Sequence, residues 1–215
     1  MTHSPTRCPL CNSGGADFFY RDRRRDFWRC KDCQLVFVPR DFHLSEAQEK
    51  AQYDLHQNRP EDPGYRQFLA RLADPLLTRL TAPARGLDFG CGPGPTLHLM
   101  LRDAGHSVEI YDKFYALNPE LLTREYDFIT ATEVVEHLAE PGEVLNSLWD
   151  MLVTGGLLAL MTKRVLDPEA FARWHYKNDP THLVFFSDST FDWLARQWQA
   201  SYSFYGKDVV IFEKP

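Results

Sequence analysis

No stretch of this 215-residue sequence reaches the roughly 18 consecutive apolar residues that a membrane-spanning helix needs. The first eleven residues are polar and contain no apolar segment of the kind found in a secretory signal peptide. We therefore expect no membrane partner and a cytoplasmic location. Positive charge is also in short supply, because the net charge of −6 argues against a chain that coats nucleic acid along its whole length.

Cysteine is scarce, with five residues in all, but four of the five form two C-x-x-C pairs. Cys8 and Cys11 make the first pair, Cys30 and Cys33 make the second, and eighteen residues lie between them. Because each C-x-x-C turn directs two sulfurs at one point, this spacing predicts a structural zinc site with four thiolate ligands. Two disulfides are disfavoured in a reducing compartment. A site with four protein ligands is closed, so we expect this zinc to take no part in catalysis.

The segment that carries these cysteines is predicted to be a small zinc ribbon over residues 1–40. Alternating segments at 16–21 and 26–29 flank a basic tip that runs from Asp22 to Arg25. Residues 1–40 hold eight Lys and Arg against four Asp, a net charge of +4 that leaves −10 for the rest. We interpret the tip arginines as a solvated hairpin end rather than a substrate site, while the charge asymmetry leaves RNA open as a substrate.

Three alternate glycines organise the remainder of the chain. Gly90, Gly92 and Gly94 follow a short apolar segment that is predicted to be a buried strand, and they form a tight turn into a helix. Glycine suits a turn that a ligand approaches closely, because a Cβ would block the approach. A second predicted strand ends at Asp112, eighteen residues past Gly94. An acid at that point is placed to accept hydrogen bonds from both hydroxyls of a ribose.

Four strings occur in a fixed order: LDFGCGPG, YD ending at Asp112, YDFITATEVVEHL and LVTGGLLALMT. Together they resemble class I S-adenosylmethionine-dependent methyltransferases, over roughly residues 45–215. The G-x-G-x-G spacing also differs from the G-x-G-x-x-G of nicotinamide enzymes. The resemblance implies that S-adenosylmethionine is the cofactor and that these motifs hold it through the following residues: Asp88, Gly90, Cys91, Gly92, Gly94, Asp112, Lys113, Thr132 and Glu133.

The fold class that follows is α/β, a doubly wound, Rossmann-like methyltransferase sheet with an antiparallel C-terminal hairpin and the small N-terminal zinc ribbon. Only fourteen residues, 113–126, separate Asp112 from Asp127 of the fourth-strand motif, and a full helix–strand–helix crossover does not fit there. We therefore expect the family's third strand to be missing and the sheet order to be 2-1-4-5-7-6. The adenine ring would then be flanked by Lys113, Phe114 and Tyr115.

Three parts are expected along the chain: the ribbon at 1–40, a lid or linker at 41–64, and the S-adenosylmethionine-binding domain at 65–215. The glycine turn and the ribbon are expected to belong to separate cores. In related methyltransferases the segment before the first core helix folds over the methionine end of the cofactor. The resemblance therefore suggests Tyr53 and His56 as lid residues, with an ordinary polar linker as the alternative.

Helices are expected near Ser45–Tyr53, at Tyr65–Leu80 with a kink at Pro75, at Thr96–Ala104, at Glu143–Leu152 and at Ser189–Gln197. The glycine pair after the fourth of these is expected to form a turn before the fifth strand. The closing hairpin is expected at 201–205 and 209–212.

Methyl transfer from a sulfonium is an in-line displacement, and most oxygen acceptors must also lose a proton. Glu133, Glu136 and His137 follow the fourth strand and would share one face of a helix, at the carboxyl edge of the sheet. His182, in an aromatic and polar loop, is expected to join them as an acid–base cluster or as a second, divalent-metal site. His175 is an alternative base. The alternative without a catalytic role is that the positive end of a helix dipole favours the two acids and that one histidine only hydrogen-bonds a loop carbonyl.

O-methylation of a small-molecule acceptor is the predicted function. Two methyltransferase subfamilies share E-x-x-E-H followed by a later His: the O-methyltransferases of ubiquinone biosynthesis and those that act on the 3′-terminal ribose of small RNAs. In the RNA enzymes the later His lies in D-H-x-F-E-W, whereas two extra residues separate Asp179 from His182 here. RNA methylation, sugar C-methylation and a non-enzymatic zinc-ribbon adaptor remain open. The sequence predicts neither the acceptor's identity nor the oligomeric state.

Overall fold

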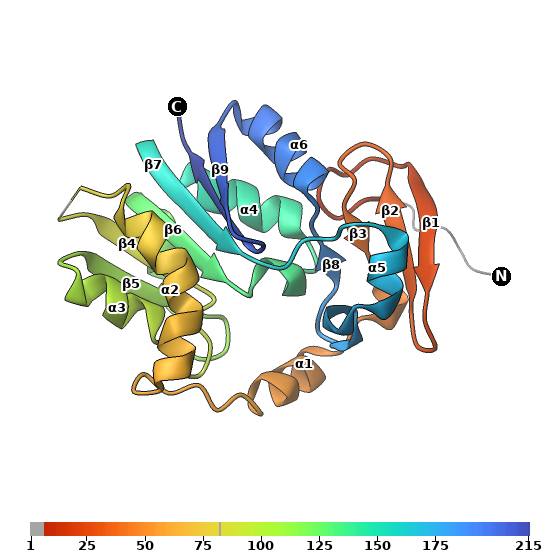
Figure 1. Ribbon diagram of the computed structural model, residues 1–215, viewed down its shortest axis with the longest axis horizontal. Coiled ribbons are helices and arrows are strands. Elements are labelled where there is room, and N and C mark those ends of the chain that lie inside the picture. The colour runs from red at the N-terminus through yellow and green to blue at the C-terminus, as the bar shows by residue number, and fades with distance from the viewer. Residues whose placement is uncertain (1–6, 82) are drawn as a thin grey trace.

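The computed structural model describes residues 7–81 and 83–215, and its central element is a six-stranded sheet with helices on both faces (Figure 1). The strand order is β5-β4-β6-β7-β10-β9, with β4 to β7 parallel and β10 antiparallel to both of its neighbours. This order confirms the predicted 2-1-4-5-7-6 sheet and its closing hairpin. The strands are β4 (Arg85–Phe89), β5 (Ser107–Tyr111), β6 (Tyr126–Thr132), β7 (Leu152–Met161), β9 (Ser201–Tyr205) and β10 (Val209–Glu213).

The third strand of the family is missing, as predicted. Between β5 and β6 the chain forms a tight turn, in which Asp112 pairs with Ala116, and one short 3-10 helix, η2 (Pro119–Thr123). Too few residues remain for a crossover helix and a strand. β5 is therefore an edge of the sheet.

Successive apolar side chains of a strand point to opposite faces of the main sheet and so contribute to two hydrophobic clusters. On β7, Leu157, Ala159 and Met161 join one core cluster, while Leu158 and Leu160 join the other. The first cluster also contains apolar residues of α2 and α3, and the second contains those of α4 and α6. The bounds of these helices are α2 (Pro63–Leu77), α3 (Leu97–Asp103), α4 (Pro141–Asp150) and α6 (Asp188–Trp198).

Several predicted helices have bounds that differ by one to three residues, among them α4, which begins at Pro141 rather than Glu143. Two differences have a clear local cause. Helix α2 begins two residues early because the Asp62 side chain accepts hydrogen bonds from the first amides, and it ends at Leu77. Gly155 and Gly156 do not form a turn before the strand, as expected, but lie within β7. They pair there with Lys214 near the chain end and shift the β6–β7 register.

A second sheet of four antiparallel strands joins the ribbon to the rest of the protein. Its order is β1-β2-β3-β8, and β8 comes from the connection after β7. The last ribbon strand has only two residues, and these pair with β8. These strands are β1 (Ala16–Arg21), β2 (Asp26–Cys30), β3 (Val36–Phe37) and β8 (Val184–Phe185).

The ribbon and the glycine turn's domain share one core, so the expectation of separate cores is wrong. Cys8, Leu10 and Trp28 belong to the same buried cluster as Leu87 and Ile129 of the main sheet. The first cysteine turn also lies directly on the start of α4. The amide of Gly142 donates to the Pro9 carbonyl at 3.2 Å, and a Cβ on Gly142 would lie 2.2 Å from the Leu10 carbonyl oxygen.

The segment before α2 forms η1 (Arg40–Phe42) and α1 (Glu46–Tyr53). Ser45 caps α1 in a reciprocal pair with Gln48, at the start of the helix expected near Ser45–Tyr53. The connection after β7 forms α5 (Pro168–Arg173) and η4 (His175–Asn178). No helix in residues 7–81 or 83–215 has the length and apolarity needed to cross a membrane.

Candidate active site

The four ribbon cysteines converge at one point. Their sulfurs all lie within 4.8 Å of one another, with 3.5 Å from Cys8 to Cys33 and 3.4 Å from Cys11 to Cys30. These distances exceed the roughly 2.05 Å of a disulfide bond. The Cys33 thiol beside it lowers the pKa of Cys8 to about 6, which favours the thiolate that a metal binds. The donor set fits a structural zinc ion with four sulfur ligands.

The backbone supports this geometry in both halves of the site. Asn12 and Gln34 each follow the second cysteine of a pair, and each has φ of 60°. Their amides donate to the carbonyls of Cys8 and Cys30, respectively. The two left-handed turns therefore close matching loops around the four sulfurs.

The glycine turn is open on one side and covered on the other. Gly90 and Gly92 have φ of +73° and +65°, and a Cβ on Gly92 would meet nothing within 4 Å. A Cβ on Gly94 would lie 2.2 Å from the carbonyl oxygen of Asn58, in the segment 41–64. Of the three glycines, only Gly92 thus leaves the space that a ligand requires, while Gly94 lets the backbone of that segment approach.

The predicted cofactor residues hold this turn in shape. The amides of Gly90 and Cys91 donate to the Tyr111 carbonyl at 2.7 and 3.2 Å. The carboxylate of Asp112 accepts from the amides of Gly92, Phe114 and Tyr115 at 2.8–3.1 Å. Asp112 therefore ties the end of β5 to the glycine turn, beside the open face at Gly92.

Asp88 and Thr132 lie at the ends of neighbouring strands. Asp88 is buried and accepts a hydrogen bond from Thr130 at 2.9 Å, and burial raises the pKa of its carboxyl to about 7. The hydroxyl of Thr132 is buried without a hydrogen-bond partner in the described part of the chain. In the turn between them, burial raises the pKa of the Cys91 thiol to about 12.

Helix α1 connects the turn after β5 to the predicted acceptor side. Lys113 donates to the Glu49 carboxylate at 2.8 Å, and the Tyr115 hydroxyl donates to Asp54 at 2.7 Å. The ring of Tyr53 lies edge to face with the ring of His137, with centroids 5.3 Å apart. The segment suggested as a lid therefore contacts both parts of the candidate site.

Three of the four predicted catalytic residues come together. One ligand atom each of Glu136, His137 and His182 lies within 4.8 Å of the others. The Nδ1 atom of His137 is 3.1 Å from the Thr181 carbonyl, and that of His182 is 2.7 Å from the Tyr176 carbonyl. Because a carbonyl only accepts, both Nδ1 atoms carry the proton and both Nε2 atoms have a free lone pair.

Burial sets the charge states of this acceptor cluster, by which we mean Glu136, His137 and His182. It lowers the pKa of His137 to about 3 and that of His182 to about 4, so both imidazoles are neutral at pH 7. Burial and, second to it, the negative charge of Glu133 together raise the pKa of Glu136 to about 8. Such displaced values are typical of functional sites.

Glu133 departs from the prediction, because it does not share a helical face with Glu136 and His137. Its amide donates to the Met161 carbonyl at 2.8 Å, so the β6–β7 pairing runs one residue past Thr132. Glu133 then turns with φ of 52°, an unfavourable value for a residue other than glycine. Only a short 3-10 helix, η3 (Val135–His137), follows.

Tyr176 links the two acids and was not singled out from the sequence. Its hydroxyl donates to Glu136 and lies 3.2 Å from Oε2 of Glu133. Burial raises the pKa of Tyr176, so the phenol keeps its proton. The only signal was its place in an aromatic and polar loop. His175, the alternative base, is exposed beside Lys163 and is not among the groups that converge.

The arginines of the ribbon tip divide into two kinds. Arg23 and Arg24 are exposed, as expected of a solvated hairpin end, whereas Arg25 is buried against the loop that carries His182. The interpretation of the whole tip as solvated is therefore wrong for Arg25. The burial of Arg25 could not be predicted from the sequence, because the carbonyls that it binds lie more than 150 residues away in the chain.

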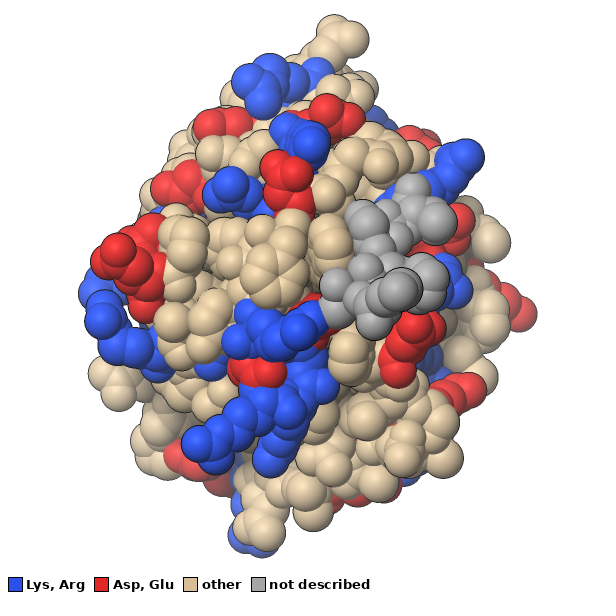
Figure 2. All heavy atoms as spheres, turned by 90° about the vertical axis from the view of Figure 1, so that its right-hand side faces the viewer, with Lys and Arg blue, Asp and Glu red and all other residues tan. Residues whose placement is uncertain are grey.

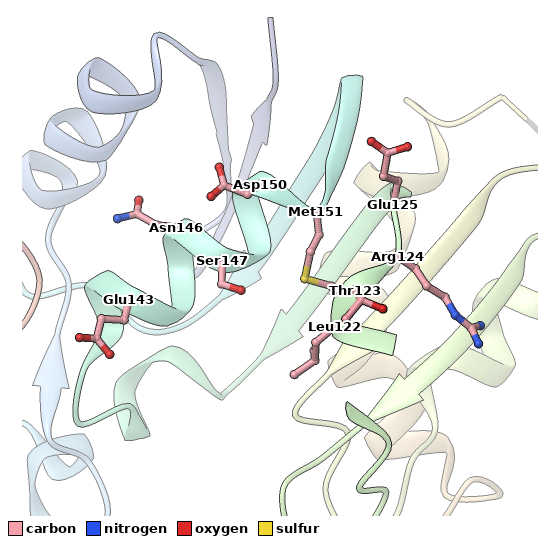
Figure 3. Close-up of a pocket in the computed structure, with 9 residues that line it drawn as sticks. All are labelled: Leu122, Thr123, Arg124, Glu125, Glu143, Asn146, Ser147, Asp150 and Met151. Carbon is pink, nitrogen blue, oxygen red and sulfur yellow. The ribbon is translucent and has the colours of Figure 1, made fainter. Parts of the chain in front are cut away.

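A groove of about 450 Å³ lies elsewhere, between α4 and the residues that precede β6 (Figure 3). Its walls include Arg124, Glu143 and Asp150, and it opens at the amino end of β6. The acceptor cluster follows the carboxyl end of the same strand. The groove therefore belongs to the opposite edge of the sheet.

Comparison with known proteins agrees with this architecture. A family model described as a methyltransferase domain matches residues 55–200, more than half of the chain. A ubiquinone biosynthesis O-methyltransferase from Shewanella sp. (strain ANA-3) is 28% identical over 86 residues. That match covers 40% of this chain and 36% of the relative, so it spans little more than a third of the relative's length.

Two solved structures share the fold. A SAM-dependent methyltransferase from Archaeoglobus fulgidus has a TM-score of 0.53 at 16% identity, over 69% of this chain and 94% of that one. Magnesium protoporphyrin IX methyltransferase from Synechocystis PCC 6803, crystallised with bound SAH, has a TM-score of 0.52 at 13% identity. That alignment covers 81% of this chain and 96% of the other.

Proposed function

The chain belongs to the methyltransferase domain family, and we propose that it moves a methyl group from S-adenosylmethionine to an oxygen atom of a small metabolite. The observation that carries this proposal is the acceptor cluster. Two neutral imidazoles with free Nε2 atoms adjoin a buried carboxyl group at the carboxyl end of β6. The glycine turn and the lid helix α1 lie at the same edge of the sheet. The only curated relative named above is itself an O-methyltransferase.

S-adenosylmethionine, when bound, supplies the sulfonium methyl group. The acceptor oxygen forms the new O–C bond as the C–S bond breaks and its electron pair passes to sulfur. The hydroxyl proton goes to a free Nε2 of the cluster. His137 is the half-buried member and is the group we propose to meet the acceptor. The positive charge that then develops favours the ionised form of Glu136, whose pKa of about 8 lies near the operating pH.

A second version of the same site uses a divalent metal ion. Neutral imidazoles and a carboxylate are suitable ligands, and Oε2 of Glu136 is buried without a hydrogen-bond partner in the described residues. The backbone carbonyls that fix both Nδ1 protons are the outer partners usual for metal-binding histidines. We propose Glu136, His137 and His182 as the ligands, where an ion would lower the pKa of an acceptor hydroxyl.

The proposal is tested by methyl release from labelled S-adenosylmethionine over a panel of phenols, catechols and nucleotide-linked sugars. We expect His137→Ala and Glu136→Gln to lower turnover by about 100-fold or more, the usual contribution of acid–base catalysis. S-adenosylmethionine affinity should change less than twofold. His175→Ala is the matched control, because that histidine is exposed. Equal losses in all three variants would contradict the assignment.

The metal version is tested separately, in excess chelator with the zinc content of the ribbon measured alongside. Lost activity that Mg²⁺ or Mn²⁺ restores would support a catalytic ion. Full activity with the ribbon zinc retained would rule it out and leave the imidazole as the base. Binding of S-adenosylmethionine without turnover on any acceptor would favour the adaptor hypothesis instead.

RNA is the second candidate acceptor, favoured by the charge of the ribbon. Figure 2 looks onto the ribbon side of the molecule and shows Lys and Arg side chains gathered in one region, with acidic side chains among them. Among the exposed arginines of the ribbon are Arg21, Arg23, Arg24 and Arg29. Phosphate contacts release counterions, so a steep loss of affinity with salt would identify RNA, and a flat response would favour a metabolite.

A further inference from the structure

The tip of the ribbon hairpin folds one arginine inward. The carboxylate of Asp22 accepts from the amides of Arg24 and Arg25, both at 2.7 Å, and closes a tight turn. Arg25 is only 7% exposed, and its guanidinium lies over the ring of Phe27 at 5.4 Å. Burying a guanidinium is costly unless its donors are used, so its partners explain its position.

Those partners are four backbone carbonyls of a single loop. One terminal nitrogen of Arg25 donates to His182 at 2.8 Å and to Pro180 at 3.3 Å. The other donates to Asp179 at 2.9 Å and to Lys177. A planar fork with fixed donor directions can gather four oxygens in this way, whereas a lysine ammonium has fewer donors and no fork.

The gathered loop orients both imidazoles of the acceptor cluster. The Thr181 carbonyl holds the Nδ1 proton of His137, and His182 belongs to the loop itself. The carboxylate of Asp179 accepts from the Thr181 amide at 2.8 Å and keeps that peptide in place. The positions of both free Nε2 atoms thus depend on the conformation that Arg25 stabilises.

A second link between the ribbon and the cluster runs through the backbone. The amide of Val38, at the end of the ribbon, donates to the Leu183 carbonyl at 2.8 Å. The amide of Leu183 in turn donates to the Glu136 carbonyl, also at 2.8 Å. The ribbon therefore contacts the loop on both sides of His182, with Arg25 on one side and β3 on the other.

We propose that Arg25 is a positioning residue of the acceptor site, through which the zinc ribbon sets the orientation of His137 and His182. The ribbon is then a part of the site rather than a separate binding module. The catalytic meaning of this inference rests on the proposed function, but the orientation of the two rings does not. The zinc site would affect the geometry of the acceptor site because it holds together the strands that flank Arg25.

The test uses the full chain and three variants: Arg25→Ala, Arg25→Lys and, as the matched control, Arg24→Ala at the exposed neighbour. The ring ¹⁵N signals of the histidines report which nitrogen carries the proton, without any turnover. We expect the signals of His137 and His182 to move in Arg25→Ala and, less far, in Arg25→Lys. They should stay in place in Arg24→Ala.

Kinetics supply the second readout. We expect kcat to fall by about 100-fold in Arg25→Ala, the effect of misplacing a reacting group by about 1 Å, with S-adenosylmethionine affinity changed less than twofold. Arg25→Lys should recover part of kcat. If Arg25→Ala does not fold, Arg25→Lys carries the same two measurements.

The outcomes separate the two proposals. Ring signals at their wild-type positions in both Arg25 variants would overturn the positioning role, even if thermal stability fell. Displaced ring signals in a protein that methylates no acceptor would uphold the positioning role and contradict the proposed function. Equal effects of Arg24→Ala and Arg25→Ala would also overturn it, because Arg24 is exposed and makes no contact with the loop through its side chain among the hydrogen bonds of the described residues.

Discussion

The imidazole rings of His137 and His182 lie edge to face with their centroids 4.6 Å apart, and each ring has its Nδ1 proton bound by a backbone carbonyl. Two cations at this distance would repel each other, and burial already disfavours either charge. The pair is therefore neutral in the folded protein at pH 7. One ring nitrogen of each histidine, one from a turn after β6 and one from a loop after β7, lies within 4.8 Å of a carboxylate oxygen of Glu136.

Tyr176→Phe should destabilise the protein by about 1–3 kcal/mol, the cost of leaving buried acceptors without a donor. The effect of Glu133→Gln should depend on whether the Tyr176 hydroxyl is present, because the phenol lies between the two acids. The side-chain amide of the glutamine can replace a hydrogen bond that the phenol donates. Urea unfolding at pH 7 of both single variants and the double variant measures the coupling. Strict additivity would contradict it. Tyr202→Phe, which loses a surface bond to Asp192, is the control and should cost less.

Cys33→Ser should abolish stoichiometric zinc, whereas Cys91→Ser should retain one zinc ion per chain. The first residue belongs to the group of four sulfurs, and the second lies in the glycine turn. Elemental analysis of freshly purified protein checks both. A chain free of zinc, or a disulfide within the group of four, would contradict a structural metal. Because ribbon and sheet share a core, we also expect Cys33→Ser to lower the free energy of unfolding of the whole chain.

Asp112→Ala should weaken S-adenosylmethionine binding by roughly 10- to 150-fold, which corresponds to about 1.5–3 kcal/mol for hydrogen bonds to a charged group. Part of this loss would come from the turn itself, since Asp112 holds three backbone amides. Arg124→Ala is the control, because it removes only a partly exposed ion pair with Glu109, and such pairs contribute little. Calorimetry measures both. Normal affinity in Asp112→Ala would contradict the motif assignment.

Asp88 should make the folded state less stable as pH rises from about 4 to about 7. Burial raises the pKa of its carboxyl from 3.8 to about 7, so the folded protein binds a proton that the unfolded chain releases in this window. The stability that the protonated Asp88 contributes is lost progressively as pH rises to about 7, and it does not return at higher pH. The difference between pKa values of 3.8 and about 7 corresponds to at most about 4 kcal/mol of stability.

Denaturant unfolding of ligand-free protein at several pH values measures this dependence. Asp88→Asn has no carboxyl to ionise, so its free energy of unfolding should fall less between pH 4 and pH 7 than that of the wild type. Parallel profiles for the two proteins would show that Asp88 ionises normally in the folded state.

Local patterns were enough to predict most of the main sheet. Apolar strands, the glycine turn and the short interval after Asp112 together predicted the strand order, because the missing crossover leaves only one arrangement of the family's sheet. The gathering of four cysteines also followed from spacing alone. Each of these features depends on residues close together in the chain or on a motif whose geometry is nearly invariant.

The details of the acceptor side could not be predicted in the same way. The position of Glu133 depends on whether β6 pairs with β7 for one more residue, and this pairing ends the helix that spacing suggested. Tyr176 joins the cluster only because its loop folds back beneath the ribbon.

The sequence by itself determined the fold class and the convergence of the four ribbon cysteines, and it pointed to Glu136, His137 and His182, which the fold brings together, since composition, periodicity and motif spacing act locally. The tertiary structure alone decided that the ribbon shares the main core, that β8 completes its sheet and that Arg25 is buried against the loop of His182. These contacts join residues up to 157 positions apart. Their free energy comes from burying apolar surface and from satisfying backbone carbonyls that only the folded chain brings together.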